Sequence, residues 1–296
     1  MNALLITPYQ GDINPLELLI QSYLNCKKNV HLKTEFKLCI IFNLCEIKIC
    51  EYFESKYTQS DILFIQYNKK PSSYAARNVG IKSYDCDYYF FVDGDVQLKS
   101  NYLIEAEKII KREDPVGSGK VEFFSAQGKN SYSIFDQCIY MQQQKYTNAG
   151  YCATANCYVK KQIFEKYGYF QEIKSGGDGE FFGRLKNKVQ IIHNHSLVVK
   201  HPTRDNFFEH KKKLSRMSEG HIDIAVLKKD SLTKLFIKNA FGILIMHPGV
   251  VNLREIYDKE KFLNIKIVLV CFLLSTYLRS VMCWRILSYV WNKRCN

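Results

Sequence analysis

Short apolar runs alternate with amphipathic stretches through the first hundred residues. Four runs are expected to form buried strands, at residues 3–7, 36–42, 62–67 and 88–92. Helical spacing of apolar residues predicts helices between them, one from Asn14 onward, one over Glu46–Tyr57 and one over Ser73–Tyr84. This alternation predicts an α/β fold, with a mostly parallel sheet flanked by helices.

The first predicted helix has clear start signals. Asn14 is a good N-cap, Pro15 suits the first helical position, and Glu17 completes a capping box. We therefore expect this helix to begin immediately after Asn14.

The pattern is looser from Val116 to about residue 205. Predicted elements are a strand at 153–159, helices at 161–167 and 179–186, and short strands at 189–192 and 197–201. Beyond Pro202 the chain becomes helical and rich in lysine. We expect one domain over residues 1–205 and a helical, basic C-terminal region over 206–296.

The C-terminus contains an apolar segment, Ile267–Leu278, that is shorter than the about 20 residues that span a bilayer. Its extension to Trp291 crosses Arg279 and Arg285, which are costly at membrane depth. Tryptophans among cations favour a helix over 264–292 that lies in the plane of a membrane surface. A buried packing or dimer helix and a true span are the alternatives.

The charge of the chain indicates which partners it binds. The 296 residues carry a formal net charge of +13, and no acidic residue follows Glu260. No nucleic-acid-binding motif accompanies the charge, so we expect no nucleic acid partner. The basic C-terminus favours an anionic membrane surface.

The eleven cysteines show no metal-ligand spacing, and no signal peptide is evident at the N-terminus. We interpret the cysteines as reduced, buried side chains of a cytoplasmic protein. Together with the charge, this predicts a peripheral protein on the inner face of the cell membrane.

Asp93-Gly94-Asp95 directly follows the fourth predicted strand. Ligands of open α/β folds bind at the carboxyl edge of the sheet, and Gly94 lets the backbone bring both carboxylates together. Two hard oxygen donors suit Mn²⁺ or Mg²⁺, which would neutralise a departing nucleoside diphosphate. A solvated turn is the alternative.

Asp178 stands in a glycine-rich turn, Ser175–Glu180, that opens a predicted helix. It is a candidate general base that takes the proton of an attacking hydroxyl. The alternative is an acidic residue that only stabilises the start of the helix.

Three further residues are candidates. His201 ends an apolar run and would be a third metal ligand, or else a structural histidine. Arg77 and Asn78, in the helix before the acidic motif, would hold the phosphate or ribose of a donor. Alternatively, Arg77 lies on the wet face of that helix.

These pieces, in this order, resemble glycosyltransferase family 2 with the GT-A fold. Ser72–Gly80 resembles its Ala-Arg-Asn-x-Gly helix, and Tyr89–Asp95 its strand and Asp-x-Asp motif. The remaining similar segments are 153–170, 176–185 and 199–202.

The resemblance implies an inverting glycosyltransferase, which moves a sugar from a nucleotide-sugar to a glycan or lipid-linked acceptor without a covalent intermediate. It implies a place in bacterial surface polysaccharide or glycolipid synthesis. Asp93 would contact the ribose and the metal shell, and Asp95 would bind the metal with His201. Asp178 would be the base, and Pro8 and Tyr9 would flank the nucleobase.

Two departures from the family pattern motivate an alternative function. Asn43 stands where the family often has an aspartate at the end of the second strand, and Gly177 replaces the usual glutamate before Asp178. The alternative is a degenerate, non-catalytic member that acts as a membrane-binding or scaffold protein. The sequence does not indicate the sugar, the nucleobase, the acceptor or the oligomeric state.

Overall fold

The computed structural model describes residues 1–28, 30–125, 128–244 and 250–295. The chain divides into two compact units. Unit 1 comprises residues 1–124, 141–172 and 177–202, and unit 2 comprises 125–140, 173–176 and 203–296. The expectation that residues 1–205 form a domain of their own stays a prediction.

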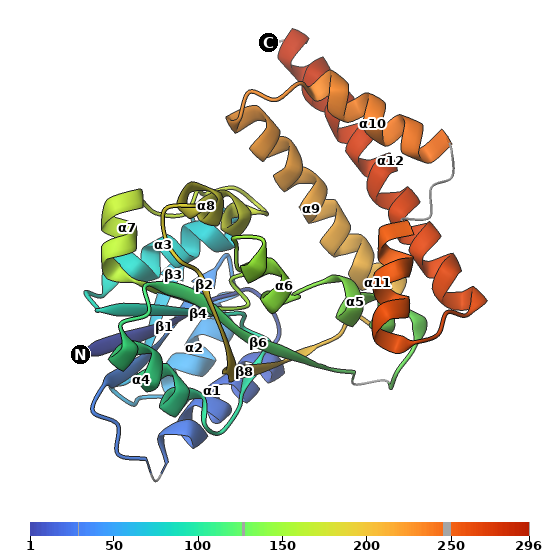
Figure 1. Cartoon of the computed structure of the whole chain (residues 1–296). Coiled ribbons are helices and arrows are strands. Elements are labelled where there is room, and N and C mark those ends of the chain that lie inside the picture. The colour runs from blue at the N-terminus through green and yellow to red at the C-terminus, as the bar shows by residue number, and fades with distance from the viewer. Residues whose placement is uncertain (29, 126–127, 245–249, 296) are drawn as a thin grey trace. The chain divides into compact units, whose positions relative to one another are not determined.

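Unit 1 is built on a mixed sheet of eight strands among the described residues, in the order β3-β2-β1-β4-β7-β6-β8-β5 (Figure 1). Its parallel half consists of β1 (Asn2–Tyr9), β2 (Glu35–Asn43), β3 (Ile62–Tyr67) and β4 (Tyr88–Val92). The other half consists of β5 (Gln97–Leu98), β6 (Val116–Phe124), β7 (Asn156–Lys160) and β8 (Ile192–Pro202). The predicted α/β fold is confirmed.

Helices cover both faces of this sheet because successive strand residues point to opposite sides. On one face Ala3 and Leu5 pack with α1 (Ile13–Lys27), α2 (Ile47–Lys56) and α4 (Tyr102–Arg112). On the other, Leu4 and Ile6 pack with α3 (Ser73–Ser83), α7 (Lys161–Tyr167) and α8 (Gly177–Leu185). A short helix, α6 (Gln143–Asn148), completes unit 1.

The start predicted for the first helix is wrong. Helix α1 begins at Ile13 with Asp12 as N-cap, so Asn14 caps nothing. Pro15 becomes the third helical residue, where its missing N–H is still one of the unpaired first-turn groups. Glu17 accepts a hydrogen bond from the Tyr52 hydroxyl instead of closing a capping box.

The strand predicted at 189–192 is wrong except for its last residue, because residues 186–191 form the turn and irregular backbone between α8 and β8. The strand predicted at 197–201 is part of β8, which begins at Ile192. Strand β8 runs parallel to β6 with a register shift between Gly119 and Lys120. The buried Asn156 amide donates to the carbonyls of Lys120 and Leu197, and so holds the two strands together at the irregularity. This side chain, from a third strand, explains why the break in the sequence pattern does not end the strand.

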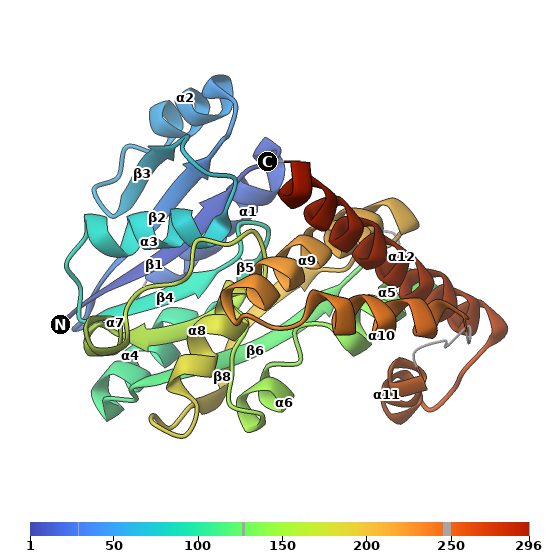
Figure 2. The ribbon, with the colours of Figure 1, turned by 90° about the horizontal axis from the view of Figure 1, so that it is seen from above.

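Unit 2 is helical, as predicted for the chain beyond Pro202. It contains α5 (Ser131–Ile139), α9 (Phe207–Leu227), α10 (Leu232–Leu244), α11 (Val250–Glu260) and α12 (Ile265–Cys295). Helix α12 lies beside α9 and α10 (Figure 2). The fully buried Asp136 of α5 pairs with Arg204 and with Lys213 of α9, which ties these segments together.

Helix α12 extends well beyond the apolar segment recognised in the sequence. Its residues 265–292 are long and apolar enough to cross a membrane. Arg279 donates to the Gly242 carbonyl of α10, and Arg285 pairs with Glu219 of α9. Exposed apolar side chains line one face of the helix, at Leu269, Leu273, Trp284, Leu287 and Trp291. The membrane role of this face stays a prediction.

Candidate metal and donor site

The acidic motif lies at the carboxyl edge of the sheet, directly after β4. Gly94 separates Asp93 from Asp95 and packs on the ring of Tyr9, at the end of β1. A Cβ atom at position 94 would lie 2.3 Å from Cδ2 of Tyr9. The buried Tyr9 ring is itself held by a hydrogen bond from its hydroxyl to the Asp12 carbonyl. Close approach of Tyr9 therefore requires glycine between the two carboxylates.

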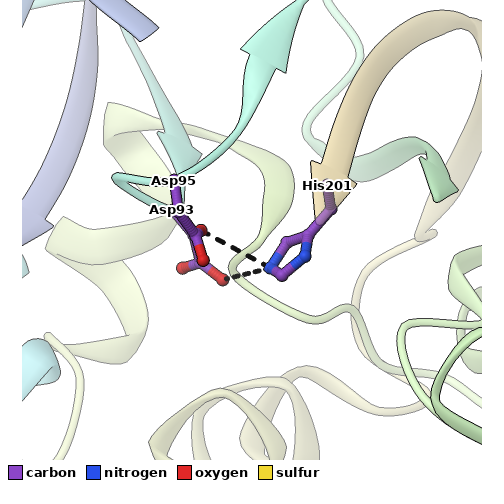
Figure 3. A group of neighbouring side chains, drawn as sticks. All are labelled: Asp93, Asp95 and His201. Atoms are coloured by element: carbon purple, nitrogen blue, oxygen red, sulfur yellow. Dashed lines mark ion pairs between the residues drawn. The ribbon is translucent and has the colours of Figure 1, made fainter. Parts of the chain in front are cut away.

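His201 is brought to this motif by strand pairing. Strand β5 begins two residues after Asp95 and pairs antiparallel with β8, matching Gln97 with Lys200. The His201 Nε2 atom lies 3.5 Å from Oδ1 of Asp95 and 3.9 Å from Oδ2 of Asp93 (Figure 3). One ligand atom from each of the three residues lies within 4.8 Å of the others.

The other ring nitrogen of His201 fixes the tautomer of the neutral ring. Nδ1 lies 2.6 Å from the carbonyl oxygen of Pro202, which can only accept, so Nδ1 carries the hydrogen. In the neutral ring, Nε2 then points a lone pair at the carboxylates. Three acceptors that converge in this way repel one another unless a proton or a metal cation lies between them. A histidine oriented by a carbonyl, with two carboxylates, fits Mn²⁺ or Mg²⁺.

Arg77 lies inside the site and not on the wet face of its helix. Its side chain is 3% exposed, and Nη2 lies 2.8 Å from Oδ1 of Asp93. The guanidinium also lies over the ring of Tyr74, one turn earlier in α3, at 5.4 Å. Arg77 therefore orients Asp93 and leaves its other carboxylate oxygen facing His201.

Asn78 has a structural role in the chain as described. Its Nδ2 donates to the Phe170 carbonyl at 2.8 Å, and its Oδ1 accepts from the Phe170 N–H at 3.1 Å. The amide thus holds the segment that follows α7. Its predicted contact with a donor stays a prediction.

Asp178 is the second residue of α8, and its Oδ1 accepts from the Gly179 N–H at 2.8 Å. Burial raises the pKa of this carboxyl, although the Gly179 N–H, the Tyr74 hydroxyl and the Arg77 charge act in the opposite direction. A raised pKa makes the carboxylate a better proton acceptor, which suits the predicted general base. Arg77 connects the two acidic parts of the site, because it forms an ion pair with Asp93 and its charge acts to lower the pKa of Asp178.

Tyr74 is a site residue that the sequence did not reveal. A Cβ atom at Gly177 would lie 2.7 Å from Cγ of Tyr74. The tyrosine ring fills the space that a side chain before Asp178 would need, so the glycine at 177 belongs to the packing of the site. The only sequence signal is that Tyr74 and Arg77 are three residues apart, on one face of a helix.

The ends of β1 and β2 form the region predicted for the nucleobase. Pro8 is partly exposed, Tyr9 is buried, and Tyr9 lies beside Phe42 in the parallel register. The next residue, Asn43, is buried, and its Oδ1 has no hydrogen-bond partner among the described residues. A buried amide oxygen of this kind needs a partner, which a ligand can supply. The roles of Pro8 and Tyr9 stay predictions.

Comparison with known proteins finds glycosyltransferases. No family model matches the chain. It is 27% identical to glycosyltransferase AglE of Haloferax volcanii over 226 residues, which cover 73% of each protein. Crystal structures of S. aureus TarS residues 1–349 match it with a TM-score of 0.52 and 16% identity, covering 76% of this chain. The match spans 66% and 67% of the two TarS chains, and one of them is a complex with UDP-GlcNAc. The predicted fold and the predicted relationship to glycosyltransferases are confirmed.

Proposed function

We propose that this chain, a glycosyltransferase of the GT-A fold, transfers a sugar with inversion from a nucleoside diphosphate sugar to a glycan or lipid-linked acceptor. The observation that carries the proposal is the convergence of Nε2 of His201 with carboxylate oxygens of Asp93 and Asp95. These acceptors stand at the sheet edge where nucleotides bind in open α/β folds.

In this proposal Asp93, Asp95 and His201 hold a divalent cation. When bound, the cation supplies positive charge that stabilises the departing nucleoside diphosphate. Arg77 fixes Asp93 through the 2.8 Å ion pair, so that one carboxylate oxygen stays aimed at the metal position. Because the ligands are already held in place, they do not have to reorganise when the reaction takes place.

Asp178 takes the proton of the acceptor hydroxyl as that hydroxyl attacks the anomeric carbon. The raised pKa of its carboxyl favours this role, and the hydroxyl of Tyr74 orients the group. A direct displacement by the acceptor inverts the configuration at the anomeric carbon. One carboxylate base is all that such a displacement requires.

The donor in this proposal carries uracil. TarS, which shares the fold, has been solved with UDP-GlcNAc. The unpaired amide oxygen of Asn43 supports the same class, because uracil offers an N–H between two carbonyls. Pro8 and Tyr9, at the end of the neighbouring strand, would flank this base.

The surroundings of the enzyme are part of the proposal. The net charge of +13 and the exposed apolar face of α12 support binding to an anionic membrane surface, from the cytoplasmic side. Such a position suits the synthesis of bacterial surface polysaccharide or glycolipid. It brings the enzyme to lipid-linked acceptors.

The experiment that tests the proposal is the release of UDP from UDP-sugars, with Mn²⁺ or Mg²⁺ and with EDTA. We expect metal-dependent release that Asp95→Asn abolishes and that Asp230→Asn, at an exposed aspartate of unit 2, leaves unchanged. A folded wild-type chain that neither binds UDP nor releases it would favour the non-catalytic, membrane-binding alternative.

A further inference from the structure

Unit 2 contains a groove of about 480 Å³ along one face of α9. Its lining combines basic and aromatic side chains, chiefly Lys174, Phe208, Lys211, Lys212, Arg216 and Tyr277. Five lining residues of α9 recur at helical spacing and so share one face of the helix, at positions 208, 211, 212, 215 and 216. Neither the sequence resemblance nor the proposed mechanism uses any of these residues.

The charges of this groove are only partly balanced. Glu219, one turn beyond Arg216, pairs with Lys174 at 2.6 Å and also with Arg285 of α12. Lys211, Lys212 and Arg216 are exposed and have no acidic partner among the described residues. Three cations within six positions of one helix repel one another, and an anion that binds between them relieves this repulsion.

Aromatic side chains border the cations. Phe208 is 71% exposed, which is unusual for so large an apolar residue. Tyr277 of α12 lines the opposite side, with its ring 5.7 Å from that of Phe207. A phosphate with an attached sugar ring or lipid chain matches this arrangement, because cations bind the phosphate and aromatic faces pack on the remainder.

We propose that the groove binds the phosphate or diphosphate group of the acceptor. The inference rests on the proposed function and deepens it, since it limits the acceptors to phosphorylated glycans or lipids. The segment 173–176, which belongs to unit 2, places Lys174 in the groove and continues directly into Gly177 and Asp178. The chain thus joins the groove to the proposed base by only a few residues.

The test is calorimetric binding of inorganic pyrophosphate to the full chain, in EDTA and at constant ionic strength. Without metal, the aspartates of the donor site do not hold pyrophosphate, and the difference between a groove variant and a control variant reports the groove. The variant Lys211→Gln/Lys212→Gln/Arg216→Gln is compared with Lys228→Gln/Lys234→Gln/Lys238→Gln. The control removes the same charge from exposed positions at the C-cap of α9 and in α10, outside the groove.

We expect the groove variant to weaken pyrophosphate binding by at least about tenfold, which corresponds to one lost charge-assisted hydrogen bond. The control variant should bind like the wild type. Equal weakening in both variants, or no binding by the folded wild type, would overturn the proposal. Metal-dependent binding of UDP, which involves the donor site and not the groove, is measured on the same variants. Failure of the groove and failure of the proposed function are therefore separable.

A second arm identifies the source of the phosphate. It uses phosphatidylcholine vesicles with and without phosphatidic acid, and compares them with soluble glucose 1-phosphate. Preference for phosphatidic acid supports a lipid-linked acceptor, and preference for glucose 1-phosphate supports a soluble one. Vesicle binding that the groove variant and the control lose equally would contradict a site in the groove.

Discussion

The Nη2 atom of Arg77 lies 2.8 Å from Oδ1 of Asp93, and the arginine side chain is almost completely buried. Removal of this cation takes the positive charge of Arg77 away from both Asp93 and Asp178. We expect Arg77→Met to lower the free energy of unfolding by about 1–3 kcal/mol, below the cost at a fully buried pair because Asp93 is partly exposed. Urea denaturation measures this, with Arg254→Met, at an exposed arginine, as the control. Equal stability of the two variants would contradict the structural role of the pair.

The contact between Gly177 and Tyr74 predicts a strict demand for glycine. Gly177→Ala should destabilise the chain by about 1–3 kcal/mol and reduce activity, because the added methyl displaces Tyr74. Gly179→Ala is the matched control in the same helix, since a Cβ atom there meets nothing within 4 Å. It should be neutral or stabilising by up to about 1 kcal/mol. Equal stability and activity of the two alanine variants would contradict the contact between Gly177 and Tyr74.

Asp178→Asn should reduce kcat by about 10²–10⁴-fold, as expected for loss of a general base, and leave metal-dependent UDP binding intact. The wild-type acid limb of activity should lie above the pKa of an ordinary aspartate, about 3.9, because burial raises the pKa of Asp178. A pH profile of kcat measures this. Full activity of Asp178→Asn would show that another group is the base.

The same pKa shift affects stability. A carboxyl with a raised pKa in the folded state contributes stability at low pH, which is lost as pH rises from the unfolded value through the folded one. Asp178→Asn should therefore lose less stability than the wild type between pH 4 and pH 8. Melting temperatures across this range check the sign, and a larger loss in the variant would contradict it.

The exposed face of α12 predicts membrane binding through apolar contact. Trp284→Ser/Leu287→Ser should weaken flotation with anionic vesicles by at least about tenfold, given about 2 kcal/mol for each side chain. The control Leu18→Ser/Ile47→Ser removes exposed apolar residues from unit 1. Loss of self-association in place of vesicle binding would identify a dimer helix. Resistance to carbonate extraction would identify a span.

Much of the fold follows from the sequence because the parallel strands are nearly continuous apolar runs. The run at 88–92 is fully buried, and it delivers Asp93 and Asp95 to the sheet edge as predicted. The capping pattern at Asn14 predicted the wrong helix start. Proline fits any position of the first turn, and in the structure Pro15 is the third helical residue and not the first. Local signals thus identified the elements better than their ends.

The rest of the site depends on contacts between distant segments. His201 meets Asp95 because β5 pairs with β8, and this pairing has no local signal in so short a strand. The sequence made His201 a candidate because it follows an apolar run, but it could not show that the histidine lies beside Asp95. The fit of Tyr74 against Gly177 is equally invisible in one sequence, because neither residue alone shows which other it contacts.

The central claim is a divalent cation site at Asp93, Asp95 and His201 that binds a nucleoside diphosphate. The most direct measurement is the melting temperature with UDP, in Mn²⁺ or in EDTA, for the wild type and Asp95→Asn. At a UDP concentration a hundredfold above Kd, we predict about 2.7 kcal/mol of added stability for the wild type in Mn²⁺. The variant, and the wild type in EDTA, should show little change. An equal rise in EDTA, or in the variant, would contradict the metal site.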